Sequence, residues 1–284
     1  MEYNFATDVK TIRSIRNLTQ EDLASAIDVE QVTISRSETG VTSPSPKLLE
    51  RTYSFAFKNG VRLNALKEMF WREDIPQDHK LLFHGAKSEI TGDISLDAGR
   101  LNNDFGQGFY TGETYEQAVS FISAFDQSSV YMLDFNPTRL VSREYSVNQE
   151  WMMTIAYYRG RLDAYSDHPK IKRLIEKSRD CDYIIAPIAD NRMFQIINSF
   201  IDGEITDQQC KHCLAATNLG MQYIFTTQKA IDNLTILERC YVPDNEKKYY
   251  VNQRTDVTAL GEDKVKMARI KYRGQGKYID EILV

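Results

Sequence analysis

The pattern of apolar and polar positions changes character once along the chain. From residue 6 to about residue 70, apolar residues such as Val9 and Ile12 recur at helical spacing, and no segment alternates as a strand would. Typical helix starts punctuate this region, for example Ser45 followed by Pro46 at a first helical position. The pattern predicts a small all-helical module.

Beyond a polar, proline-containing stretch, the chain changes to short apolar runs rich in aromatic and β-branched residues. These runs predict strands at 81–86, 108–112, 130–135, 183–189, 222–227 and 235–242. Helical patterns lie between them at 113–125, 149–161, 167–179, 191–201, 206–217 and 228–233. Strands and helices do not alternate regularly, so we expect an α+β domain rather than a doubly wound sheet.

These patterns divide the chain into four parts. We predict a helical domain over 1–72, a linker over 73–80, an α+β domain over 81–243 and a polar appendage over 244–284. The appendage has only a weak apolar pattern, so we expect it to be peripheral.

Composition narrows the class of protein. The chain has 284 residues, of which 42% are hydrophobic, enough for a packed core. Its net charge of −5 excludes a molecule that coats nucleic acid as a whole, so any such contact must be local. No apolar run is long enough to cross a bilayer and the start is unlike a signal peptide, so we expect a cytoplasmic protein without membrane contact.

The cysteines are expected to be reduced and structural. Four of them are too few and too unevenly placed for a disulfide framework. Cys210, His212 and Cys213 fall within one predicted helix and lack a second pair of ligands, so we expect core positions and no metal site.

Residues 18–40, LTQEDLASAIDVEQVTISRSETG, have the pattern of a helix-turn-helix. Leu23, Ile27 and Ile34 would form its buried face. Glu30, Gln31, Thr33 and Arg36 would point outward from the second helix. Together with PSPKLL at 44–49, this stretch resembles the xenobiotic-response-element and phage-repressor family of DNA-binding domains over about residues 6–60.

The resemblance implies contacts with DNA. Thr19 and Gln20 would contact phosphate, and Gln31, Thr33 and Arg36 would read base edges. A homodimer would suit a repressor-type module.

The module departs from the family pattern in two residues and in charge. Asp28 stands where the family usually has a turn glycine, although aspartate tolerates a left-handed turn, and Ser37 stands where a large aliphatic residue usually packs. Residues 1–60 hold seven basic and eight acidic residues, a net charge of −1. We therefore expect weak monomeric DNA binding that needs dimerisation. The alternative is a helical module that makes only protein contacts.

Three fragments carry the chemistry of the second domain: FHGA at 83–86, DFGQGFYTG at 104–112 and QYIFTT at 222–227. Their order resembles the His-Tyr-Glu branch of the ADP-ribosyltransferase superfamily, and more narrowly a bacterial family of uncharacterised domains allied to ADP-ribosyltransferase toxins, over about 80–242. The resemblance implies an ADP-ribosyltransferase-like fold and NAD as substrate. It also implies a protein or nucleic-acid acceptor, a toxin-like or phage-defence role, and a small antitoxin partner.

The transfer passes through an oxocarbenium-like ribose, so its site must grip the ribose and hold the nicotinamide flat. By resemblance, His84 would bond a ribose hydroxyl, the Gly85 backbone would pair with the nicotinamide amide, and Tyr110 would stack on its ring. For each side chain, a buried structural position is the alternative.

Further cofactor contacts are implied by position. Phe121 would supply a second aromatic wall, with Tyr115 as a substitute. Arg100 and Asn103 would meet the NAD phosphates.

Gln222 stands where the resembled family has its catalytic glutamate. A neutral amide can hold a ribose hydroxyl but cannot act as a base. Three alternatives stay open: transfer to a nucleophile that needs little activation, a base borrowed from Asp104, Asp190 or Glu113, or an inactive domain that senses NAD. We favour the first two, which make the protein an NAD-dependent ADP-ribosyltransferase whose DNA-binding module would autoregulate or target it. The third, a transcription regulator with a degenerate transferase domain, is the alternative.

Overall fold

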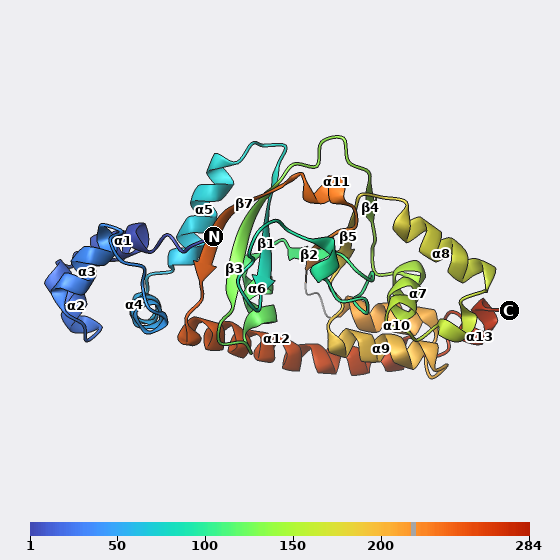
Figure 1. Cartoon of the computed structure of the whole chain (residues 1–284). Helices are drawn as coiled ribbons and strands as arrows, with labels where there is room; N and C mark the ends of the chain where they lie inside the picture. Colours follow the sequence, from blue (N-terminus) through green and yellow to red (C-terminus); the bar gives the residue numbers. More distant parts are fainter. Residues whose placement is uncertain (217–219) are drawn as a thin grey trace. The chain divides into compact units, whose positions relative to one another are not determined.

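The computed structural model describes residues 1–216 and 220–284, without the side chains of residues 98 and 256–260. The chain forms two compact units, each assembled from segments that are distant in sequence (Figure 1). Unit 1 comprises Met1–Gly92, Thr114–Phe135 and Thr235–Gln253. Unit 2 comprises Asp93–Glu113, Asn136–Leu234 and Arg254–Val284.

Unit 1 begins with the predicted helical module. Its helices are α1 (Phe5–Arg16), α2 (Gln20–Ala26), α3 (Gln31–Glu38), α4 (Pro46–Lys58) and α5 (Leu63–Asp74). The last of these ends two residues inside the stretch that the sequence indicates as a linker. Local chemistry explains the helix starts: the Thr19 hydroxyl accepts a hydrogen bond from the backbone of Asp22, and the Ser45 hydroxyl accepts one from Leu48.

The rest of unit 1 contains three strands, in the order β1 (Lys80–Ala86), β3 (Ser129–Phe135) and β7 (Leu234–Tyr241). Strands β1 and β3 are antiparallel. Helix α6 (Tyr115–Ile122) packs against β1, on the face that carries Leu81 and Phe83. Three of the predicted strands are thereby confirmed.

Unit 2 holds four strands, in the order β4 (Ser142–Glu144), β5 (Tyr183–Pro187), β6 (Met221–Phe225) and β2 (Phe109–Gly112). Strand β4 runs parallel to β5, and the two other pairings are antiparallel. Strand β4 was not predicted, because a three-residue edge strand with two exposed polar ends has no apolar alternation.

Helices surround one core in unit 2. They are α7 (Gln149–Tyr158), α8 (Pro169–Arg179), α9 (Asn191–Ile201), α10 (Asp207–Ala215) and α11 (Gln228–Ile231), with short 3₁₀ turns at Leu96–Ala98 and Asp163–Tyr165. Trp151, Ile155 and Phe200 are fully buried in this core. The predicted helix over 206–217 is found, although residue 217 lies outside the described residues. The domain thus has mixed α and β content.

The C-terminal segment is not the peripheral appendage that its composition suggests. It forms α12 (Asp244–Lys271) and α13 (Ile279–Ile282). Ile279, Ile282 and Leu283 are buried in the core of unit 2, and the side-chain amide of Gln209 donates to the Arg269 carbonyl at 2.8 Å. These apolar residues recur at helical spacing, but they span little more than one turn at the end of a polar segment, which is too short to indicate burial. Within the described part of the chain, no helix is long and apolar enough to span a membrane.

Candidate DNA-reading helix and candidate ligand site

Helix α3 presents the side chains that the sequence predicts for base reading. Gln31 and Arg36 are exposed and Thr33 is half-buried, while Ile34 between them is fully buried in the module core. Val32 is also 48% exposed, a residue that the sequence analysis did not select. An exposed aliphatic side chain beside Gln31 can contact a thymine methyl group.

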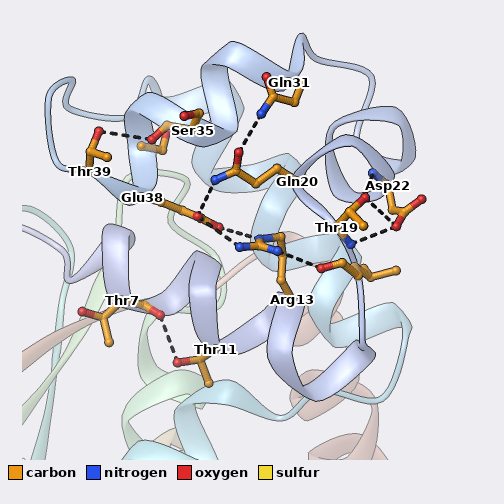
Figure 2. A network of polar contacts seen from close by, with 12 residues as sticks. Thr7, Thr11, Arg13, Thr19, Gln20, Asp22, Gln31, Ser35, Glu38 and Thr39 are labelled. Carbon is orange, nitrogen blue, oxygen red and sulfur yellow. Dashed lines mark hydrogen bonds and ion pairs between the residues drawn. The ribbon is translucent and has the colours of Figure 1, made fainter.

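A chain of polar contacts joins the first three helices (Figure 2). The Gln31 side-chain amide donates to Gln20 Oε1 at 2.6 Å, and the Gln20 amide donates to Glu38 Oε2 at 2.7 Å. Glu38 is also paired with Arg13, whose Nη1 donates to the Leu18 carbonyl at 2.8 Å. This arrangement fixes the orientation of Gln31 before any ligand arrives.

Glu38 is the hub of this network. Burial opposes its ionisation, but hydrogen bonds from Arg13 and Gln20 outweigh that effect and lower its pKa. The carboxylate therefore stays charged and keeps both partners in place. Neither Arg13 nor Glu38 could be selected from the sequence, because the two residues lie on different helices.

The predicted phosphate contacts also have structural roles. The Thr19 backbone N–H donates to Asp22 Oδ2 at 2.8 Å and the Asp22 backbone N–H donates to the Thr19 hydroxyl at 3.0 Å, which closes a capping box. Thr19, Gln20 and Gln31 together line a recess of about 700 Å³ at the start of α2. Arg13 and Glu21, of opposite charge, line the same recess.

The two departures from the family pattern are compatible with the fold. Asp28 has a φ of 55°, a left-handed turn that aspartate tolerates, and Arg51 Nη1 donates to its carbonyl. Ser37 is buried, and its hydroxyl donates to the Thr33 carbonyl at 2.8 Å. A small polar residue thus replaces aliphatic packing without leaving an unsatisfied hydroxyl.

In unit 2 the structure brings together two of the three predicted catalytic residues. Strands β2 and β6 pair Tyr110 with Ile224 and Gly112 with Gln222. Opposed residues and residues two apart in a strand share one face of a sheet, so Tyr110 and Gln222 lie on the same face. His84 lies in unit 1, on β1 opposite Tyr131.

Gln222 belongs to a buried polar pair. Only 8% exposed, it donates from Nε2 to Asp104 Oδ2 at 3.0 Å and to the Pro187 carbonyl at 3.3 Å. Asp104 is 6% exposed and also accepts from Arg159 Nε at 2.9 Å and from the Ala189 backbone at 3.2 Å. One of the substitute bases considered from the sequence therefore lies next to Gln222. Arg159, which neutralises it, was not foreseen.

Tyr110 supports the wall of a cavity. Its hydroxyl accepts from the Phe105 backbone at 3.1 Å and donates to the Gly106 carbonyl at 2.7 Å. Burial raises the pKa of this phenol far above its ordinary value, so it stays protonated. Phe105 and Gly106 line a cavity of about 630 Å³, a volume ordinary for small-molecule sites.

The cavity offers aromatic, amide and charged groups. Its other lining residues are Leu101, Asn102, Gln107, Tyr157, Tyr158, Gly160, Asp163, Ser178, Arg179 and Thr226. Arg100 is exposed and Asn103 half-buried, and it is their neighbours Leu101 and Asn102 that border the cavity. Aromatic rings beside an arginine and an aspartate suit a ligand with a flat ring, hydroxyl groups and a phosphate.

The aromatic residues considered for a second wall differ in their surroundings. Phe121 is 65% exposed on α6. Tyr115 is 1% exposed, and its hydroxyl donates to Glu246 Oε1 at 3.1 Å. The substitute role for Tyr115 was therefore wrong, because its ring is held inside the core of unit 1.

Gly85 has a packing explanation. A Cβ atom there would lie 2.6 Å from the Ala118 carbonyl oxygen, so α6 can approach β1 only because this residue is a glycine.

The other two candidate bases, Asp190 and Glu113, lie on different elements of unit 2. Asp190 caps α9 by accepting from the Met193 backbone at 2.9 Å and pairs with Arg254 at 3.1 Å. Glu113 is half-buried directly after β2.

The cysteine cluster is buried as expected for core positions. Cys210 and Cys213 are inaccessible, and burial raises the pKa of both thiols. His212 stacks on Tyr272, with ring centroids 3.6 Å apart. No group of three or more metal-binding side chains occurs within the described residues.

Two family models match the chain. The model described as "Protein of unknown function (DUF3990)" matches residues 81–236, more than half of the chain. The model described as "Helix-turn-helix" matches residues 9–51. The predicted N-terminal helix-turn-helix is thereby confirmed. No curated protein and no solved structure shows a significant match.

Proposed function

The chain belongs to the family described as a protein of unknown function (DUF3990) and carries a helix-turn-helix, and from this we propose that it is a DNA-binding transcription regulator whose DUF3990 domain senses NAD or a related nucleotide. The observation that carries the sensing role is the Gln222 amide, which is neutral, buried and bonded to Asp104 and Pro187. In the resembled family the corresponding position holds the catalytic glutamate, so a neutral residue here favours sensing over transfer.

The DNA-binding part rests on the helix-turn-helix match and on the pre-oriented face of α3. Gln31 is held by Gln20, and Arg36 projects freely enough to reach a base edge. A side chain that is already oriented loses less conformational entropy when it binds.

The nucleotide-binding part rests on the cavity next to Tyr110. Tyr157 and Tyr158 offer ring faces, Asp163 can accept from ribose hydroxyls, and Arg179 can pair with a phosphate. The cavity lies on unit 2 itself and needs no contribution from another part of the chain.

A calorimetric titration of the full-length protein with NAD tests the sensing role. We expect saturable binding that Arg179→Ala weakens at least tenfold, because this substitution removes the cation that lines the cavity. NAD should also change the affinity for a DNA site obtained by selection from random duplexes, because coupling between two ligands is reciprocal. Absence of binding at millimolar NAD would refute the sensing role.

The DNA-reading role has its own test. Arg36→Ala should reduce the preference for the selected site.

ADP-ribosyl transfer is the second candidate, favoured by one contact. Asp104 Oδ2 lies 3.0 Å from Gln222 Nε2, so a carboxylate is present beside the residue that replaces the catalytic glutamate of the resembled family. If the protein transfers ADP-ribose, incubation with labelled NAD and cell extract would place label on a macromolecule. Loss of that label in Asp104→Asn, with NAD binding retained, would support this role for Asp104. Binding of NAD without transfer favours the sensor.

A further inference from the structure

The C-terminal end of α12 and the turn after it carry a local concentration of positive charge. Residues 264–277 contain six basic residues and no acidic residue, in a chain whose net charge is −5. The six are Lys264, Lys266, Arg269, Lys271, Arg273 and Lys277. Glu262 and Asp263 precede this stretch and Asp280 follows it.

One side of this part of α12 is fixed against unit 2. Val265 and Ala268 pack on its core, and Arg269 Nη2 donates to the Ser199 hydroxyl at 2.8 Å. Tyr272 stacks on His212. The helix is therefore held in place, and its opposite side faces outward.

The outward side has a regular arrangement. Met267 is 71% exposed and Ile270 is 72% exposed, which marks the outermost strip of the helix. At 100° per residue, Lys264 and Lys271 lie along one flank of this strip. Lys266 lies along the other, followed by Arg273 beyond the helix end. We call these four exposed residues the basic face.

All four side chains of the basic face are exposed, although the Lys271 ammonium also lies 5.4 Å from the centroid of the Tyr272 ring. Among the described residues, the one ion pair that this face makes is between Lys266 and Asp263, at 3.6 Å, with both side chains more than 70% exposed. Such a contact contributes little and is easily exchanged for another anion.

We propose that the basic face binds the phosphate backbone of double-stranded DNA, as a contact separate from the base-reading helix α3. The inference rests on the DNA-binding part of the proposed function. A DNA-reading module ordinarily draws its affinity from phosphate attraction, but residues 1–60 here have a net charge of −1. The basic face supplies the missing positive charge on the same chain.

The salt dependence of binding to a non-specific duplex tests this proposal. Each phosphate contact that is lost lowers the slope of log affinity against log salt by about 0.9. Fluorescence anisotropy of the full chain with a labelled 25-base-pair duplex, between about 50 and 200 mM salt, would measure that slope. We expect Lys264→Gln/Lys271→Gln and Lys266→Gln/Arg273→Gln each to reduce it by one to two.

Two control variants separate this contact from other effects. Lys172→Gln/Arg173→Gln removes two exposed charges from α8 of the same unit and should leave the slope near that of the wild type. Met267→Gln/Ile270→Gln keeps the charges and should have little effect, because phosphate contacts do not need the apolar strip. An unchanged slope in both basic-face variants would overturn the proposal. An equal loss in the α8 control would do so as well, since net charge would then be the cause.

Two further measurements distinguish the proposal from its premise and from a different partner. Arg36→Ala should lower the preference for a selected site over a scrambled duplex while keeping the basic-face dependence. If no site is preferred but the basic face still governs the slope, the regulator role fails and this inference stands. If both basic-face variants instead lose only binding to vesicles containing phosphatidylglycerol, the face binds lipid and the proposal is wrong.

Discussion

Replacement of Lys67 by methionine should destabilise unit 1 by several kilocalories per mole. Lys67 Nζ lies 2.7 Å from Asp8 Oδ2 and 2.6 Å from Glu238 Oε1. The side chains of Asp8 and Glu238 are 3% and 6% exposed, and that of Lys67 is 11% exposed. This cluster joins α1 and α5 of the helical module to strand β7.

The magnitude follows from the charge that would be left behind. The cluster already holds two acids and one base, and burial raises the pKa of Asp8. Methionine keeps the apolar stem but removes the cation that pairs with both carboxyls. Removal of one partner from a buried pair typically costs about 3–5 kcal/mol. Tyr53 and Trp71, which donate to Asp8 and Glu238 respectively, can compensate only in part.

Urea unfolding would measure the loss of unfolding free energy, and hydrogen exchange would show which elements it affects. We expect faster exchange in α1, α5 and β7, with exchange in the unit 2 core unchanged. The loss should shrink as pH falls from 8 to 5, because protonation removes the uncompensated charge. Asp8→Asn added to Lys67→Met should recover part of the stability. An unfolding free energy within about 1 kcal/mol of the wild type would refute this account of the cluster.

Three further changes test other contacts. Burial raises the pKa of Glu246 to about 7 from an ordinary 4.5. The contribution of this group to the free energy of unfolding is therefore fully present below about pH 4.5 and is lost as pH rises through 7. Glu246→Gln should therefore remove about 3 kcal/mol of pH dependence from urea unfolding between pH 4 and 8, and parallel curves for the two proteins would contradict this. Gly85→Ala should cost about 1–3 kcal/mol in thermal unfolding, because the added Cβ meets the Ala118 carbonyl. Gln222→Glu places a second carboxylate beside buried Asp104, so its melting temperature should fall more at pH 8 than at pH 5, and an equal fall would point to altered packing instead.

Local chemistry made much of the fold predictable. Thr19 and Ser45 begin helices where the sequence indicates, because a capping hydroxyl bonds a backbone group three residues away. The left-handed turn at Asp28 depends on one residue and its neighbours. The apolar, aromatic-rich runs likewise indicate Tyr110 and Gln222 as strand residues, although only the pairing of β2 with β6 places them on one face.

The sequence by itself therefore determined the helix-turn-helix and six of the strands, whereas the residues that line the cavity of unit 2 were not selected from it. Only the tertiary structure decided which polar groups meet: Glu38 with Arg13, and Gln222 with Asp104 and Arg159. It also decided that the polar C-terminal segment packs into unit 2. The physical reason is distance along the chain. Caps and periodicity involve residues within one turn or one strand, whereas Asp104 and Gln222 are 118 positions apart and meet only through the packing of the elements that carry them.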